Sequence, residues 1–251
     1  MKTDWDYSHL AAAYVKRPDY SSSAIAGMLT LTGVADGDPV CDIGAGVAHL
    51  TLQLAARRLL VAAVEPNDAM RALGISRTAG LSNVTWHEGT GEATGQPSGA
   101  FALTTFGSSF NVTDRALALK ESARLLRPGG WFACLWNHRD IDDPLQTQVE
   151  AAIAAEVPGY SYGTRREDQT DVINASGLFG PVHRIEGAVV HAQPVEDCLE
   201  AWRSHATLQR QAGARFNAVI DRIGGVLNAN GKAVIQVPYT TRMWLAQVTS
   251  A

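Results

Sequence analysis

Apolar residues along the chain fall into two kinds of stretch, short continuous runs and longer segments with helical spacing. The short runs are 40–43, 59–64, 84–86, 101–106 and 131–136. Their length and β-branched residues are typical of strands that are buried on both faces of a sheet. A long helical segment follows Thr113-Asp114, which offers it an N-cap. Strands that alternate with helices in this way predict βαβ units and a parallel sheet.

The chain on either side of this alternating region has a different pattern. Pro18 disfavours helical geometry at the residue before it, so we expect a first helix over 7–16 and a second helix that ends at Gly33. Beyond Asn137, residues 140–180 predict two helices and loops without a strand. The rest predicts a sixth strand, two helical segments and a final strand region, at 182–192, 194–211, 216–227 and 233–248.

The most informative stretch is Val40-Cys41-Asp42-Ile43-Gly44-Ala45-Gly46, with Glu65 at the end of the next strand. The two glycines let the backbone turn tightly off the strand and leave its N–H groups accessible to a ligand. An ionised carboxylate such as Glu65 can accept hydrogen bonds from two ribose hydroxyls. The pattern indicates a nucleoside site at the carboxyl edge of a doubly wound sheet. Taken alone, it also fits an ordinary strand-to-helix turn with acids near helix starts.

Composition narrows the class of protein. The chain has 251 residues, 46% of them apolar, which suits one α/β domain with an additional lobe. A net charge of −4 and an isoelectric point near 6.0 predict no nucleic-acid partner and no binding to an anionic membrane. We see no signal peptide and no apolar run long enough to span a membrane, so we expect a cytoplasmic protein. Cys41, Cys134 and Cys198 lack the spacing of a metal site, and we expect inert thiols and no metal.

The order of the motifs resembles that of the class I S-adenosylmethionine-dependent methyltransferases. The segments that carry this resemblance are Asp42-x-Gly44-x-Gly46, Glu65-Pro66-x-x-x-Met70, Glu88-Gly89-Thr90-Gly91-Glu92 and Leu125-Leu126-Arg127-Pro128-Gly129-Gly130. Two flanking segments resemble the small-molecule branch that includes trans-aconitate methyltransferase-like proteins, namely Tyr14-x-x-Arg17-Pro18-x-Tyr20 and Val237-Pro238-Tyr239-x-Thr241. Ala48 stands where the family has a third glycine, and Phe110-Asn111 begins a run that departs from the branch.

The resemblance implies a Rossmann-like α/β fold, with a seven-stranded, mixed but mostly parallel sheet, helices on both faces and a helical lid. Residues 1–36 would form an N-terminal helical arm over the cofactor, and 37–140 the core that binds S-adenosylmethionine. Residues 141–232 would form the lid and the sixth strand on the substrate side, and 233–251 the final strand.

The resemblance also assigns roles to single residues around the cofactor, S-adenosylmethionine. Asp42 would lie beside its methionyl amino group, Glu65 would accept the ribose hydroxyls, and Arg17 could pair with its carboxylate. The full set of predicted cofactor-binding residues is Tyr14, Arg17, Asp42, Gly44, Ala45, Gly46, Glu65, Pro66, Met70, Thr90, Gly91, Glu92, Phe106, Gly107 and Ser108.

The predicted reaction is methyl transfer to an O or N atom of a small organic molecule, such as a secondary metabolite. Because the sulfonium is already activated, alignment of the reactants is the main catalytic device we expect. The catalytic candidates are His138 as a base and Tyr7 and Phe110 as walls of the pocket, and the substrate-binding candidates are Asn111, Trp136, Asn137 and His205. Two alternatives stay open, an NAD-dependent oxidoreductase and a catalytically inactive regulator that binds S-adenosylmethionine.

Overall fold

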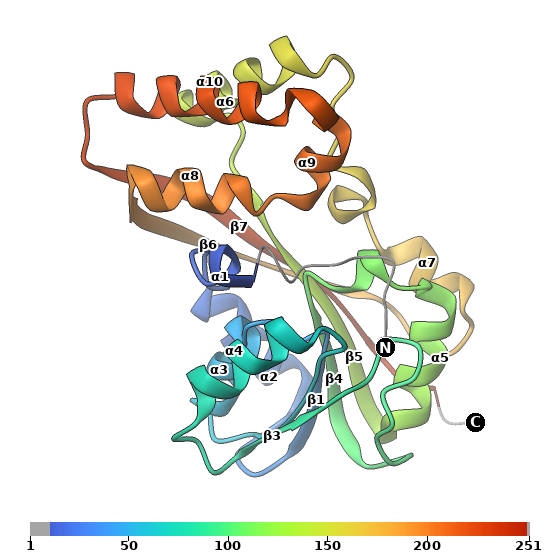
Figure 1. Cartoon of the computed structure of the whole chain (residues 1–251). Helices are drawn as coiled ribbons and strands as arrows, with labels where there is room; N and C mark the ends of the chain where they lie inside the picture. Colours follow the sequence, from blue (N-terminus) through green and yellow to red (C-terminus); the bar gives the residue numbers. More distant parts are fainter. Residues whose placement is uncertain (1–10, 250–251) are drawn as a thin grey trace.

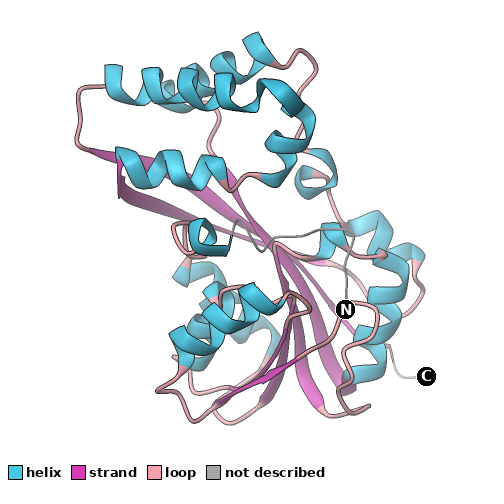
Figure 2. Cartoon of the chain, in the orientation of Figure 1, coloured by secondary structure: helices cyan, strands magenta, loops and turns pink. Residues whose placement is uncertain are grey.

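The computed structural model describes residues 11–249, without the side chain of Arg165. Seven strands form a single mixed sheet in the order β3-β2-β1-β4-β5-β7-β6 (Figure 2). The strands are β1 Pro39–Ile43, β2 Leu60–Val64, β3 Val84–His87, β4 Phe101–Gly107, β5 Leu126–Arg139, β6 His183–Pro194 and β7 Val234–Gln247. Strands β1 to β5 are parallel, and β7 runs antiparallel between β5 and β6. The predicted seven-stranded Rossmann-like fold is confirmed.

Helices cover both faces of the sheet (Figure 1). On one face, α2 (Ser22–Thr32) and α3 (His49–Ala55) bury apolar side chains against β1, β4 and β5. On the other face, α5 (Arg115–Leu125) and α7 (Thr170–Ala175) pack with the short helix η1 (Phe110–Val112). α4 (Asp68–Thr78) lies beside β3, where Gly74 leaves room for the Trp86 ring. Because helices cover both faces of the sheet, a ligand can reach it at the carboxyl ends of the parallel strands.

A helical lid stands above the carboxyl edge of the sheet (Figure 1). Its helices are α6 Pro144–Glu156, α8 Val195–Arg203, α9 Ala206–Ala212 and α10 Phe216–Ala229. They enclose an apolar core of their own, to which β7 contributes Ile235 and Val237. The long strands β6 and β7 therefore belong to the sheet at one end and support the lid at the other.

The structure differs from the expected division of the chain in two places and from one expected helix. α2 packs on the sheet through Ile25 and Met28, so it is not part of an arm over the cofactor. α7, expected in the lid, packs on the sheet through Ile173. The helix expected over 194–211 is broken, because His205 Nδ1 accepts a hydrogen bond from the Leu208 N–H and caps a new helix there.

The first helix is described only in its last part. That part is α1 (Ala11–Tyr14), and residues 7–10 of the expected helix lie outside the described residues. The remaining short helices are η2 (Gly163–Arg166) and η3 (Gly213–Arg215). Within residues 11–249, no helix is long and apolar enough to cross a membrane. The same residues contain no group of three His, Cys, Asp or Glu side chains placed to hold a metal ion.

Candidate active site

A cavity of about 430 Å³ lies between the carboxyl ends of β1, β2 and β4 and the lid. Its lining includes every residue that the sequence assigned to the cofactor, from Tyr14 in the N-terminal segment to Ser108 after β4. Apart from Tyr14 and Arg17, these residues lie at the ends of successive strands or in the segments that follow them, and the parallel sheet brings those segments to one edge. The structure thus gathers the predicted set in one place, while the contact of each residue with the cofactor stays a prediction.

The turn after β1 contains two glycines with positive φ, Gly44 and Gly46, which differ in how closely they are packed. Gly44 has φ +68°, and a Cβ there would lie 2.5 Å from Ser109 Cβ. Gly46 has φ +57°, and its missing Cβ would meet only the Gly44 carbonyl oxygen at 4.0 Å. Ala48 adopts φ +74°, a left-handed conformation that glycine adopts without strain. Ala48 therefore keeps a left-handed backbone conformation without being glycine.

The Asp42 carboxylate is buried at the end of β1 and is held by two threonines. Oδ2 accepts a hydrogen bond from Thr51 Oγ1 at 2.7 Å, and Oδ1 accepts one from Thr105 Oγ1 at 2.9 Å. Burial raises the pKa of Asp42 to about 6, although both hydroxyls oppose the shift. A cation beside Asp42 would favour its ionised form, which agrees with the predicted place of the methionyl amino group. Sequence reasoning did not find the two threonines.

The Glu65 carboxylate closes the glycine turn onto the next loop. Oε2 accepts the Gly46 N–H and Oε1 accepts the Asn67 N–H, each at 2.9 Å. Burial raises the pKa of Glu65, and these two backbone hydrogen bonds lower it in part. Each carboxylate oxygen keeps a second lone pair for a ligand hydroxyl. Glu65 can therefore shape the turn and bind ribose at the same time.

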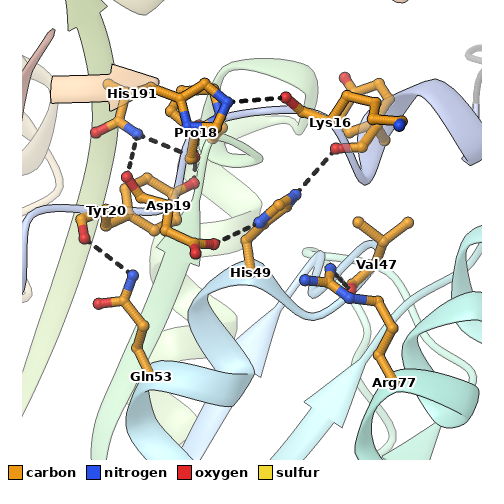
Figure 3. Close-up of polar contacts among 12 residues, drawn as sticks. Lys16, Pro18, Asp19, Tyr20, Val47, His49, Gln53, Arg77 and His191 are labelled. Carbon is orange, nitrogen blue, oxygen red and sulfur yellow. Dashed lines mark hydrogen bonds and ion pairs between the residues drawn. The ribbon is translucent and has the colours of Figure 1, made fainter. Parts of the chain in front are cut away.

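Residues 15–21, which we call the strap, connect α1 to α2, and Arg17, Pro18 and Tyr20 of the strap line the cavity. Figure 3 shows the polar contacts that hold the strap. The core holds the strap through His49, whose Nδ1 is 2.7 Å from Asp19 Oδ1, and through Gln53 Nε2, which donates to the Tyr20 carbonyl at 2.9 Å. His191 of β6 lies 3.2 Å from the Lys16 carbonyl on the other side. The strap is thus attached both to the sheet domain and to the strands that carry the lid.

Arg17 lies on the side of the strap that lines the cavity. Its Nη2 donates to the Ser204 carbonyl at 2.7 Å, and its guanidinium stacks 3.7 Å from the Tyr14 ring centre. No carboxylate of the described residues forms an ion pair with it.

Tyr20 also lines the cavity and hydrogen-bonds Ser108 Oγ at 2.9 Å. Gly107 lies in the cavity lining, and a Cβ there would come within 3.0 Å of the Tyr20 hydroxyl oxygen and 3.2 Å of Leu50.

The other half of the cavity is formed by the lid and the far ends of β5, β6 and β7. Asn137 and His205, predicted to bind substrate, both line it. Asn137 also anchors the strap, because its Nδ2 donates to the Asp19 carbonyl at 3.0 Å. The site residues predicted from the sequence include none of the other residues in this half, which are Arg139, Gln146, Tyr162, Arg166, Gln193, Cys198, Ala201, Trp202, Val237 and Tyr239.

Several predicted catalytic and substrate residues lie elsewhere. Phe110 is fully buried and packs 5.4 Å from the rings of Phe106 and Phe132, so it belongs to the core of the sheet domain. His138 is buried in β5 and is not part of the cavity lining. Trp136 Nε1 donates to Asn111 Oδ1 at 2.9 Å, and both line a smaller neighbouring cavity of about 180 Å³. Tyr7 lies outside the described residues.

Strand geometry explains why His138 does not line the cavity. Successive side chains of a strand point to opposite faces, so Asn137 and Arg139 share one face while Trp136 and His138 share the other. Asn137 faces the cavity, and the same alternation brings Arg139 to it. The expected strand ended at Trp136, whereas β5 continues to Arg139. Applying the alternation to a longer strand would have selected Arg139 and rejected His138.

Comparisons with known proteins agree with this geometry. Residues 40–130 match the family described as methyltransferase domain. An uncharacterized methyltransferase of Mycobacterium tuberculosis is 36% identical over 124 residues, 49% of this chain and 48% of that protein. The ubiquinone/menaquinone biosynthesis C-methyltransferase UbiE of Enterobacter sp. is 26% identical over 187 residues, 71% of this chain and 69% of that protein. The YcgJ structure from Bacillus subtilis has a TM-score of 0.57 at 17% identity and covers 91% of this chain and 99% of its own.

Residues 40–130 are thus similar to a methyltransferase domain, and the fold of the chain is shared with a solved structure. Binding of S-adenosylmethionine and methyl transfer by this chain are proposals. The family match does not support the NAD-dependent oxidoreductase considered from the sequence. The match to the mycobacterial relative spans about half the length of that protein. The resemblance to the trans-aconitate methyltransferase-like branch stays a prediction, and the reaction and its acceptor are the subject of the proposal below.

Proposed function

We propose that this protein transfers a methyl group from S-adenosylmethionine to an O or N atom of a small organic molecule. The observation that carries the proposal is one continuous cavity with two different halves. The loops after β1, β2 and β4 line one half, and the lid with the ends of β5, β6 and β7 lines the other. Such a cavity suits a cofactor and an acceptor that must meet in line.

The residues of the first half fit S-adenosylmethionine. Glu65 offers acceptors for ribose hydroxyls, and the open space at Gly46 admits a ligand close to the backbone. Arg17 offers donors to the methionyl carboxylate, and Asp42 offers a carboxylate to the amino group. The bound cofactor supplies an electrophilic methyl group on a sulfonium. The chain supplies position and excludes water, which is the larger part of catalysis for such a leaving group.

The side chains around the acceptor half favour alignment over general-base catalysis. His205 lines this half, but its Nδ1 already accepts the Leu208 N–H. His138 is outside the lining. Asn137, held by the strap and by Thr241 Oγ1 at 2.6 Å, can orient an acceptor but does not take up a proton at neutral pH. A neutral amine nitrogen or a carboxylate oxygen attacks the methyl carbon without prior loss of a proton, so such an acceptor needs only to be held in line.

Isothermal titration calorimetry with S-adenosylhomocysteine tests the cofactor half of the proposal. We expect binding by the wild-type protein and no binding of NAD. Glu65→Ala should weaken S-adenosylhomocysteine binding about 10- to 100-fold, because a ribose hydroxyl loses its charged acceptor. Asp68→Ala removes an exposed carboxylate on α4 and is the matched control, with binding within about twofold of wild type.

Turnover tests the reaction itself. Incubation of the protein with S-adenosylmethionine and a panel of small metabolites should release S-adenosylhomocysteine only when an acceptor is present. In the calorimetric test, a folded Glu65→Ala variant with unchanged affinity for S-adenosylhomocysteine would show that Glu65 does not bind the cofactor. Tight S-adenosylhomocysteine binding with no turnover on any acceptor would instead support the regulatory alternative.

A further inference from the structure

We propose that the acceptor carries an oxyanion group, a carboxylate or a phosphate, and that Arg166 is the cation that selects it. The proposal rests on the proposed function, since it names the class of acceptor for the same cavity. Arg139 and Arg166 are the two arginines in the acceptor half of the lining, and only one of them has a carboxylate partner among the described residues.

Arg139 already has hydrogen-bond and ion-pair partners within the protein. Its guanidinium donates to Gln146 Oε1 and to Glu150 Oε1, each at 2.9 Å, and also to the Tyr162 hydroxyl. It stacks 4.0 Å from the Trp202 ring centre. The ion pair with Glu150 neutralises its charge, so Arg139 serves as a fixed part of the wall.

Arg166 lies beside Arg139 and has spare hydrogen-bond donors. Its Nη2 donates to the Arg139 carbonyl at 2.9 Å, and the guanidinium stacks 4.3 Å from the Tyr162 ring centre. No Asp or Glu of residues 11–249 forms an ion pair with it. A guanidinium has five N–H donors in a planar fork, which matches a carboxylate or a phosphate.

The charges around Arg166 leave one positive charge uncompensated. The charged and titratable groups that act on it are Tyr162, Arg139, Glu150 and Arg242, and Glu150 is already paired with Arg139. Burial and the neighbouring Arg139 lower the pKa of Arg166, while Tyr162 and Glu150 raise it in part. A half-buried cation with no partner is costly, and a bound oxyanion would remove that cost.

The rest of the acceptor half suits a flat apolar body. Trp202, Tyr162 and Tyr239 place aromatic side chains in the lining, and Val237 and Ala201 add aliphatic surface. An acceptor with a planar apolar part and one oxyanion group would therefore use both features. Benzoate, phenyl phosphate and benzamide share an aromatic ring and differ in charge, which makes them suitable probes.

The experiment measures affinity for these probes by calorimetry on protein saturated with S-adenosylhomocysteine. Saturation keeps Arg17 engaged with the cofactor, so that the probes report on the acceptor half. We expect benzoate or phenyl phosphate to bind at least about tenfold more tightly than benzamide, as a charge-assisted pair requires. Arg166→Gln should abolish this preference, and Arg166→Lys should retain part of it because it keeps the charge.

Arg203→Gln is the matched control, because Arg203 is exposed on α8 and does not line the cavity. It changes net charge equally and should leave the preference intact. Equal affinity of the wild-type protein for benzoate and benzamide, or a preference that survives in Arg166→Gln, would overturn the proposal. S-adenosylhomocysteine affinity is measured in the same variants. If it is normal while the oxyanion preference is absent, only the acceptor class is wrong; if S-adenosylhomocysteine does not bind at all, the proposed function itself fails.

Discussion

Gly44 and Gly37 both adopt a left-handed backbone conformation, with φ of +68° and +82°. They differ in what surrounds them. A Cβ at Gly44 would lie 2.5 Å from Ser109 Cβ, whereas one at Gly37 would have no neighbour within 4 Å. At Gly44 glycine is thus required by both conformation and space, and at Gly37 by conformation alone.

Gly44→Ala should therefore destabilise the protein by about 2–5 kcal/mol, because backbone strain and a steric clash with Ser109 add. Gly37→Ala should lower the free energy of unfolding by about 1–2 kcal/mol through strain alone. Urea unfolding of the two variants measures the difference. Equal losses would show that the close approach to Ser109 is relieved without cost.

Asp42 makes a pH-dependent contribution to stability. Burial raises its pKa from 3.8 to about 6, so the folded protein holds this proton more tightly than the unfolded chain does. The free energy of unfolding due to Asp42 therefore falls as the pH rises from about 4 to about 6. The shift corresponds to about 3 kcal/mol.

The Asp42→Asn variant cannot ionise at this position and should lose this dependence. The difference in free energy of unfolding between Asp42→Asn and wild type should change in favour of the variant by up to about 3 kcal/mol as the pH rises from about 4 to 7. Urea unfolding at both pH values measures this change. Asp221→Asn, at an exposed position on α10, controls for the removal of one carboxylate. A stability difference between wild type and Asp42→Asn that is independent of pH would contradict the raised pKa.

At the scale of elements, the strap is the piece that joins the two halves of the cavity. Gln53 and Asn137 of the core donate to its carbonyls, while Lys16 pairs with Asp197 of α8 at 2.9 Å. Bound cofactor would add contacts to Arg17 of the strap and to Tyr14 at the end of α1. Cofactor and strap should thus stabilise one another.

Trypsin cleavage after Lys16 measures this coupling. Saturating S-adenosylhomocysteine should slow cleavage there by at least about tenfold, because cleavage requires local opening of the strap. Lys232, exposed in the connection between α10 and β7, provides an internal control whose cleavage rate should not change. A strap cleaved equally fast with and without the ligand would exclude Tyr14 and Arg17 from the cofactor site.

At the scale of the whole molecule, the lid and the sheet share a strand. β7 contributes Ile235 and Val237 to the core of the lid, and Met243 and Leu245 to the core between the sheet and α2. Unfolding of the lid would expose one end of a strand whose other end lies between β5 and β6. The two parts should therefore unfold together.

Differential scanning calorimetry should show one transition, with calorimetric and van't Hoff enthalpies in agreement. A concentration of S-adenosylhomocysteine about 100 times its Kd should raise the midpoint by about 5–10 °C, corresponding to about 2.7 kcal/mol. The single transition should move as a unit. Two separate peaks, only one of which responds to the ligand, would show that the lid folds independently.

The sequence by itself determined the parallel strands and the cofactor half of the cavity. Asp42, Gly44 and Glu65 lie at the ends of adjacent strands, so a local pattern of strand, turn and helix is enough to bring them together. Hydrophobic runs located the parallel strands β1 to β5, because burial on both faces leaves a continuous apolar signature.

Only the tertiary structure decided the acceptor half. Arg139, Arg166, Trp202 and Tyr239 come from four elements that are far apart in the chain, and no local pattern links them. The same holds for Phe110, whose apolar ring could face either a pocket or a core, and which the packing against Phe132 places in the core. Local motifs specify contacts between neighbouring loops. The wall of the cavity between lid and sheet depends instead on where each long strand ends, because that decides which of its alternating side chains face the cavity.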